Sequence, residues 1–149
     1  MSASQEDYLE TILHLVEEGQ VARPRDIAAR MKVNRSSVTG ALQALATREL
    51  VHYAPYDLVT LTESGRAAAT DVARRHSALS DFLVKVLGFP PAEAEEAACG
   101  MEHAVPPKLL HRFRMFLEFA EADSKGESDW IARFRSRCAG GAARRRRPM

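Results

Sequence analysis

The residues Cys99-Gly100-Met101-Glu102-His103 carry a thiol, a carboxylate and an imidazole at helical spacing. Positions i, i+3 and i+4 lie on one face of an α-helix, so a helix through this segment would direct all three side chains the same way. Each is a ligand type for divalent transition metals. Taken singly, Cys99 could be a small buried side chain, and Glu102 and His103 could belong to a solvated face. Their combination predicts part of a metal site.

Three groups on one helix do not complete such a site, and the remaining ligands must come from other elements. Asp7 and Glu10 form a second i, i+3 pair of carboxylates near the N-terminus, and His76 stands midway along a long helical stretch. If these helices meet, they would hold one metal ion or two close ones. The candidate metal ligands are Asp7, Glu10, His76, Cys99, Glu102 and His103.

Hydrophobic periodicity, caps and breakers predict the elements that must position these ligands. Helices are expected over residues 4–18, 24–31, 35–49, 62–87, 92–105, 108–122 and 129–137, and short strands over 50–53 and 58–61. Ser4 with Asp7 is expected to cap the first helix, and Asn34 or Ser36 the third. The fold class is therefore mostly α, with an N-terminal winged helix-turn-helix followed by an all-helical domain. The expected boundaries are 1–70, 71–138 and a disordered basic tail, 139–149, that contains Arg144–Arg147.

The two helices over 24–31 and 35–49 have the pattern of a helix-turn-helix, whose second helix enters the major groove of DNA. Between residues 23 and 49, six basic residues face two acidic ones, whereas residues 91–129 hold nine acidic and four basic residues. A basic half beside an acidic half fits a DNA-facing unit joined to a cation-binding unit. Arginine can pair with guanine, glutamine with adenine, and serine or threonine with bases or phosphates. The candidate DNA-binding residues are Arg25, Arg35, Ser36, Ser37, Thr39 and Gln43, with Tyr53 in the wing beside His52 and Tyr56.

The 149 residues suffice for one ordinary domain or two small ones, and 46% apolar residues suffice for a core. Two cysteines, Cys99 and Cys138, do not form a disulfide framework. No signal segment opens the chain, and no apolar run has the length of a membrane span. We therefore expect a cytoplasmic protein without membrane association, in which Cys99 stays reduced and able to bind metal.

Several short motifs, in this order and spacing, make the chain resemble the diphtheria toxin repressor family, in particular its manganese transport regulator branch. They are Glu6-Asp7-Tyr8-Leu9-Glu10, Asp26-Ile27-Ala28, Ser36-Ser37-Val38-Thr39, Leu61-Thr62-Glu63-Ser64-Gly65, Arg75-His76 and the Cys99–His103 segment. The resemblance covers about residues 4–122. It implies a homodimeric repressor that Fe(II) or Mn(II) activates for binding to double-stranded operator DNA, in the two-domain form without an SH3-like third domain.

The same resemblance identifies the ligand set as a hybrid of two branches. The manganese branch carries Glu at the position of Cys99, and the iron branch carries Met at the position of Asp7. A thiolate favours Fe(II), Co(II), Ni(II) or Zn(II), whereas the two N-terminal carboxylates favour harder ions. We expect Fe(II) as the cognate ion and Mn(II) as the second choice, with Co(II), Ni(II) or Zn(II) able to bind in vitro. Ser80 and Glu95 replace two ligands of the iron branch's ancillary site, which argues against a second site of that type.

Apolar stripes on the helices over 62–87 and 108–122 favour a symmetric dimer, although part of each stripe must serve the core of one subunit. Two other functions remain open. The chain could be a winged-helix regulator that senses a different ligand, or a small metal enzyme, since Cys, His and Glu can hold catalytic zinc. The enzyme is disfavoured because the sequence shows no separate nucleophile or general-base constellation and no phosphate-binding glycine loop.

Overall fold

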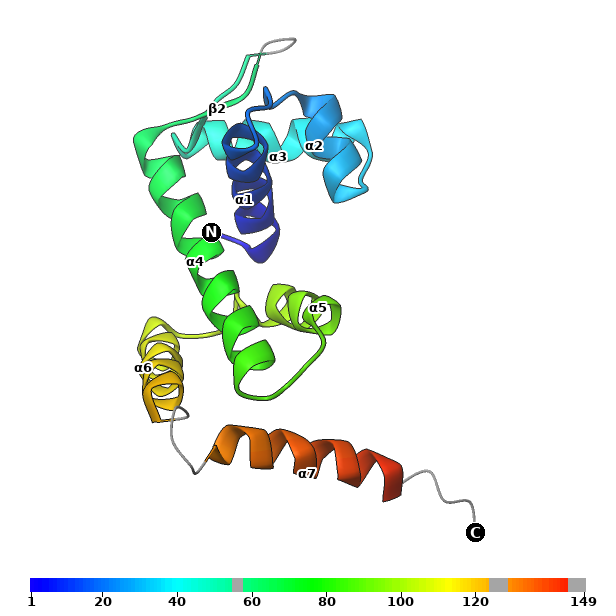
Figure 1. Ribbon diagram of the computed structural model, residues 1–149. Coiled ribbons are helices and arrows are strands. Elements are labelled where there is room, and N and C mark those ends of the chain that lie inside the picture. The colour runs from blue at the N-terminus through cyan, green and yellow to red at the C-terminus, as the bar shows by residue number, and fades with distance from the viewer. Residues whose placement is uncertain (55–57, 124–128, 145–149) are drawn as a thin grey trace. The chain divides into compact units, whose positions relative to one another are not determined.

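The computed structural model describes residues 1–54, 58–123 and 129–144, with side chains as far as Gly141. The chain divides into two compact units, Met1–Arg74 and Arg75–Met149. A single helix, α4 (Glu63–Lys85), begins in the first unit and continues into the second (Figure 1). The mostly helical fold with an N-terminal helix-turn-helix confirms the predicted fold class.

The N-terminal unit packs three helices and a two-stranded antiparallel sheet around one core. Its elements are α1 (Ala3–Glu17), α2 (Pro24–Met31), α3 (Arg35–Thr47), β1 (Val51–His52), β2 (Thr60–Leu61) and the first part of α4. In the sheet, Val51 pairs with Leu61 and His52 with Thr60. The strands are shorter than predicted, and Tyr56 lies outside the described residues. Core side chains come from all three helices, among them Leu9, Ile27 and Leu42.

Helix α1 begins with a capping box that differs from the predicted cap. The Ser2 hydroxyl accepts a hydrogen bond from the Gln5 N–H at 3.2 Å, and the Gln5 side chain accepts one from the Ser2 N–H at 3.1 Å. The predicted cap by Ser4 and Asp7 is wrong because Ser2 and Gln5 already satisfy the first free N–H groups, which places Ser4 inside the first turn.

The turn between α2 and α3 is fixed by residues with special backbone roles. Pro24 opens α2, where its missing N–H costs nothing. Lys32 ends the helix in the left-handed conformation at φ 56°. Asn34 then caps α3, because its side-chain oxygen accepts the Ser37 N–H at 2.8 Å. These features set the direction in which α3 leaves the turn.

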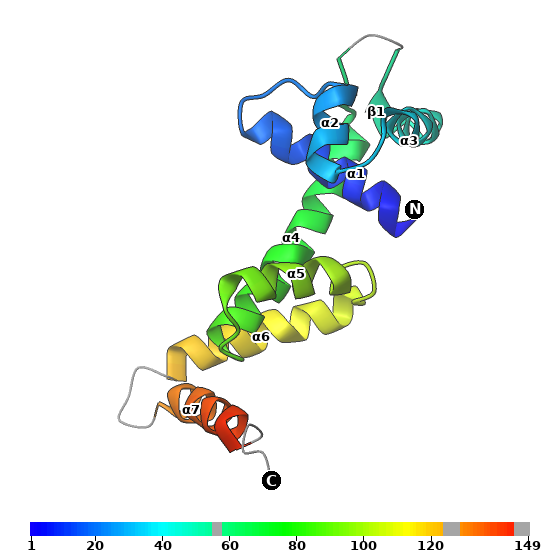
Figure 2. The same cartoon turned by 90° about the vertical axis from the view of Figure 1, so that its right-hand side faces the viewer.

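The C-terminal unit packs the second part of α4 with α5 (Pro91–Met101), α6 (Pro107–Asp123) and α7 (Trp130–Arg144). Figure 2 shows α5 and α6 beside this part of α4. One cluster joins Leu79 of α4 to Ala98 of α5 and Leu110 of α6. A second cluster joins Val86, Ala120 and Ile131, and thereby holds the start of α7.

Two predicted boundaries in this unit are wrong. The helix expected over 92–105 ends at Met101, and residues 102–104 form turns before Pro106 and Pro107. Pro106 has no N–H to donate to the Glu102 carbonyl and restricts Val105 to extended backbone, so a regular helix cannot continue to residue 105. The tail expected from Ala139 is helical as far as Arg144. Once the first turn of α7 is packed, the alanines and arginine of this segment extend the helix, although Gly140 and Gly141 oppose it. Residues 145–149 lie outside the described part of the chain.

None of the helices within the described ranges combines the length and apolar character that crossing a membrane requires.

Candidate metal centre and DNA-reading helix

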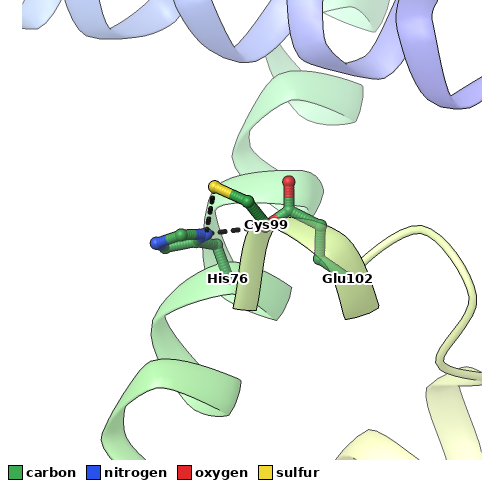
Figure 3. A group of neighbouring side chains, drawn as sticks. All are labelled: His76, Cys99 and Glu102. Atoms are coloured by element: carbon green, nitrogen blue, oxygen red, sulfur yellow. Dashed lines mark hydrogen bonds and ion pairs between the residues drawn. The ribbon is translucent and has the colours of Figure 1, made fainter. Parts of the chain in front are cut away.

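Three side chains that the sequence nominates as ligands converge in the C-terminal unit. His76 projects from α4, Cys99 from the last turn of α5, and Glu102 from the residue after that helix (Figure 3). One ligand atom from each lies within 4.8 Å of the other two. The Nδ1 atom of His76 is 2.7 Å from Glu102 Oε2 and 3.8 Å from Cys99 Sγ. Potential nitrogen, sulfur and oxygen ligands are therefore close enough to share one ion.

Glu102 is the centre of this cluster, and its carboxylate is only 1% exposed. Its second oxygen, Oε1, lies 3.4 Å from Nε2 of His103, so the two carboxylate oxygens face two different imidazoles. The Arg75 guanidinium donates to the Glu102 carbonyl oxygen at 2.9 Å and holds the backbone where α5 has just ended. Glu102 keeps helical backbone angles, and its N–H bonds to the Ala98 carbonyl at 2.9 Å. The face of α5 that carries Cys99 therefore continues for one residue beyond the end of the helix.

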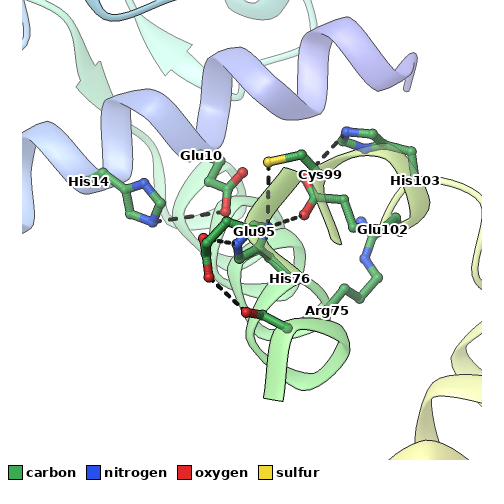
Figure 4. A network of polar contacts seen from close by, with 9 residues as sticks. Glu10, His14, Arg75, His76, Glu95, Cys99, Glu102 and His103 are labelled. Atoms are coloured by element: carbon green, nitrogen blue, oxygen red, sulfur yellow. Dashed lines mark hydrogen bonds and ion pairs between the residues drawn. The ribbon is translucent and has the colours of Figure 1, made fainter. Parts of the chain in front are cut away.

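The other edge of His76 is also occupied. Nε2 of the imidazole lies 2.7 Å from Glu95 Oε2 (Figure 4). The Ser80 hydroxyl donates to Glu95 Oε1 at 2.7 Å. Glu95 comes from α5 and Ser80 from α4, one turn after His76. His76 is thus held between two carboxylates, a buried one at Nδ1 and an exposed one at Nε2.

These contacts shift the pKa of two groups in opposite directions. Burial disfavours the charged form of His76, but hydrogen bonds and charges from Glu95 and Glu102 outweigh it and raise the His76 pKa. The hydrogen bond from Ser80, together with the bond and charge of His76, lowers the pKa of Glu95 despite some desolvation. The site therefore stabilises a positive charge at the imidazole.

This arrangement fits a divalent transition metal. An imidazole, a thiol and a buried carboxylate form a borderline-soft ligand set, with a second imidazole on the same carboxylate. A buried carboxylate is costly unless a positive charge compensates it. An ion held by His76, Cys99 and Glu102 would supply that charge in place of the imidazole proton.

The two remaining nominated ligands belong to the N-terminal unit. Asp7 and Glu10 lie half-buried on α1, and Glu10 pairs with His14 at 3.9 Å (Figure 4). Their role as ligands stays a prediction.

The nominated DNA-binding residues lie mainly along one helix of the N-terminal unit. Arg35, Ser36, Ser37 and Gln43 are exposed on α3, and Thr39 is half-buried there. The Ser36 hydroxyl donates to Asn34 at 2.8 Å and the Thr39 hydroxyl to the Arg35 carbonyl at 3.0 Å, so both keep acceptor capacity for a ligand. Arg25 is exposed on α2, and Tyr53 follows β1, half-buried.

Sequence reasoning did not assign a role to Glu95 or Ser80. A signal was available, since Ser80 lies four residues after His76 and Glu95 four residues before Cys99. Residues at i and i+4 share a helix face, so both side chains belong to the faces that carry the ligands.

The apolar stripe of α6 is divided between the core and the surface. Leu110 and Ala120 are buried, whereas Leu109, Met115, Phe116 and Phe119 are exposed, Phe119 by 61%. With Phe82 and Phe113, whose rings lie 4.7 Å apart, these exposed side chains line an open apolar groove. Aromatic patches of this kind mark interaction surfaces.

A helix-turn-helix unit followed by a helical unit with a His, Cys and carboxylate cluster is typical of a DNA-binding regulator and provides a candidate metal site. Comparisons with known proteins identify the family. A family model described as the iron dependent repressor N-terminal DNA binding domain matches residues 1–59. One described as the metal binding and dimerisation domain of the same repressors matches residues 62–131. The chain belongs to the iron-dependent repressor family, whose members are transcriptional regulators and not enzymes. The family predicted from the sequence motifs is confirmed.

Individual relatives agree with this assignment. The transcriptional regulator MntR of Escherichia coli O157:H7 is 39% identical over 113 residues, which cover 76% of this chain and 72% of that protein. The HTH-type transcriptional regulator MntR of Bacillus subtilis is 32% identical over 126 residues, covering 85% and 88%. A solved structure titled as a manganese-dependent transcriptional repressor complex with manganese has a TM-score of 0.72 at 35% identity, covering 77% of this chain and 53% of that one. The chain thus spans about half the length of that solved relative.

Proposed function

We propose that this protein is a homodimeric repressor that binds double-stranded operator DNA when a divalent metal fills the His76, Cys99 and Glu102 cluster. The observation that carries the proposal is the convergence of these three ligand types within 4.8 Å in a chain that also presents a helix-turn-helix. We place it in the cytoplasm, where Cys99 would remain reduced.

His103, Asp7 and Glu10 are proposed to complete the ligand set. Asp7 and Glu10 belong to α1, which shares its core with α2 and α3. Ligation by residues of both units would restrain the DNA-reading helix relative to the dimerising unit. Repulsion among unneutralised carboxylates would oppose that restraint in the metal-free protein. Metal would then select the arrangement in which two α3 helices match successive half-sites. Operator DNA must in return tighten metal binding by the same factor.

For the cognate metal we propose Fe(II), because the Cys99 thiolate is a soft ligand in a set otherwise made of nitrogen and oxygen. Mn(II) is the second candidate, since the solved relative named above is titled as manganese-dependent. Replacing the thiolate by a carboxylate separates the two. In Cys99→Glu, we expect the ratio of Mn(II) to Fe(II) affinity to rise. An unaltered ratio would mean that Cys99 is not a ligand.

A metal-titrated DNA-binding experiment under anaerobic conditions tests the function. Promoter fragments selected by the protein are titrated with Fe(II), Mn(II) or chelator, and operator affinity is measured at each concentration. We expect metal to tighten binding and chelator to release it. Glu102→Gln should abolish this response, whereas Glu118→Gln, which removes an exposed carboxylate from α6, should preserve it. Equal operator affinity with metal and with chelator would instead favour a regulator that senses another ligand.

The exposed apolar groove on α6 is proposed to bury itself against the same groove of a second subunit. Leu109, Met115 and Phe119 are too exposed to contribute fully to the core of one subunit. A two-fold interface repeats one patch on both partners, which a continuous aromatic groove can provide. The description of the matching family model as a dimerisation domain supports this use.

A further inference from the structure

The orientation of the His76 ring is determined by its two neighbours. Nδ1 faces Glu102 Oε2 and Nε2 faces Glu95 Oε2, each at 2.7 Å. Turning the ring by 180° about its bond to Cβ would exchange each nitrogen for a carbon and lose both contacts. The face with Cys99 and Glu102 therefore receives Nδ1, and Glu95 receives Nε2.

Glu95 is itself held in place, although its side chain is 59% exposed. Ser80 is buried on α4 and donates its hydroxyl to Glu95 Oε1 at 2.7 Å, while Oε2 stays on His76. The carboxylate is thus shared between two side chains of α4 that lie one turn apart. A freely mobile surface carboxylate would have no such second anchor.

We propose that Glu95 is a positioning residue for the metal centre: it accepts the Nε2–H of His76 and thereby presents Nδ1 to the metal. This inference rests on the proposed function, because it requires the cluster to bind metal. A neutral imidazole carries its proton on one nitrogen only, and the lone pair of the other is the ligand. With the proton kept at Nε2 by Glu95, the Nδ1 lone pair faces Cys99 and Glu102. A proton present on Nδ1 in the metal-free protein leaves to solvent when metal binds.

The assignment separates two roles that a carboxylate beside a metal-binding histidine can have. A ligand contributes an oxygen to the ion, and its loss removes or reshapes a binding site. A positioning carboxylate contributes a hydrogen-bond acceptor, and its loss typically weakens metal binding by about 10–100-fold without changing the number of ions bound. An amide keeps the acceptor oxygen and loses the charge, so glutamine should restore much of the positioning role.

The test uses the full chain with Zn(II) as a diamagnetic probe. Zn(II) affinity and stoichiometry are measured for the wild type, Glu95→Ala, Glu95→Gln and Glu96→Ala. Glu96 is the matched control, because it is the next exposed carboxylate on α5 and is not among the described partners of His76. In parallel, long-range ¹H–¹⁵N spectra of the Zn(II)-loaded protein report which His76 nitrogen is protonated and which is bound to metal.

We expect a metal-bound Nδ1 and a protonated Nε2 in the wild type. Glu95→Ala should lose about 10–100-fold in Zn(II) affinity at unchanged stoichiometry, Glu95→Gln should recover most of it, and Glu96→Ala should match the wild type. Wild-type affinity in Glu95→Ala, loss of a bound ion, or zinc on Nε2 would each overturn the inference. Failure of the proposed function looks different, because the wild type would then bind no Zn(II), or its operator affinity would ignore metal.

Discussion

Gly65 lies in the first turn of α4, within the N-terminal unit, and its replacement by alanine should destabilise the protein. The Leu50 carbonyl accepts the Thr62 N–H at 3.1 Å, and the Thr62 hydroxyl both donates to the Glu49 carbonyl and caps Gly65. These bonds hold the first turn of α4 close to Glu49 and Leu50, which follow α3. Gly65 is buried there, with no room for a side chain.

The magnitude follows from the contact that a methyl group would make. A Cβ on Gly65 would lie 1.8 Å from the Leu50 oxygen, whereas real Cβ contacts are essentially never below 3.0 Å, so backbone must move by more than 1 Å. Overpacking of this kind costs up to about 3 kcal/mol. Losing the bond from Thr62 to Leu50 adds about 1 kcal/mol. The better helix propensity of alanine returns at most about 1 kcal/mol. The net loss of unfolding free energy should be about 3 kcal/mol.

Urea unfolding of the full chain, followed by circular dichroism, measures this loss. The control is Gly40→Ala, since Gly40 lies within α3 and an added Cβ there meets nothing within 4 Å. Relief of the glycine entropy cost should stabilise that variant by about 0.5–1 kcal/mol. If Gly65→Ala proved neutral, or stabilising like its control, the close approach to Leu50 would not exist in solution.

Three further outcomes are expected. Metal affinity should fall as the pH drops through the raised pKa of His76, because a protonated imidazole cannot bind metal. The stability of the metal-free protein should change in the opposite direction. The stabilisation that the carboxylate partners give protonated His76 is present at low pH and is lost as the pH rises through that pKa. Calorimetry in buffers of different ionisation enthalpy counts the released proton, and metal affinity independent of pH would contradict this. Arg35→Ala should weaken operator binding. If Arg35 contacts phosphate, the variant should also reduce the salt dependence of binding by about one counterion, which filter binding at several salt concentrations would measure. An unchanged affinity would mean that Arg35 does not contact the DNA. Phe119→Lys should shift the protein toward monomer in sedimentation experiments while circular dichroism stays native, and an intact dimer would place the interface elsewhere.

The helices were predictable because their signals are local. Helix α2 begins at Pro24 and ends at Met31, as predicted. A proline suits the first turn of a helix, and the periodic apolar residues of this segment end at Met31. The errors lie where two local signals compete. The cap of α1 was expected at Ser4 with Asp7, whereas the observed cap is Ser2, which has a glutamine at the favoured third position. The end of α7 could not be found from apolar content, because an exposed helix needs none once it is nucleated.

The convergence of His76, Cys99 and Glu102 was predictable from their residue types, but the contacts among these residues were not. Spacing brings Cys99 and Glu102 to one face, yet no sequence rule states that Glu102 is buried or that its two oxygens face His76 and His103 separately. Such contacts depend on how α4 and α5 pack, which Leu79 and Ala98 determine through the core. The contact between Glu95 and His76 was missed for the same reason: helical spacing places each residue on a ligand-bearing face, but the two lie 19 residues apart on different helices.

The charge balance of the cluster supports the proposed response to metal. Glu102 is buried and Glu95 lies at the opposite edge of one imidazole, so the site needs a positive charge in every state of the protein. In the metal-free protein, a protonated His76, favoured because both carboxylates raise its pKa, would supply it. A metal held by His76, Cys99 and Glu102 would supply it instead and would displace a proton from Nδ1, while the proposed role of Glu95 would keep the proton on Nε2. Under the proposed function, the response would depend on competition between a proton and a metal for one nitrogen of His76, which would tie the metal threshold to pH.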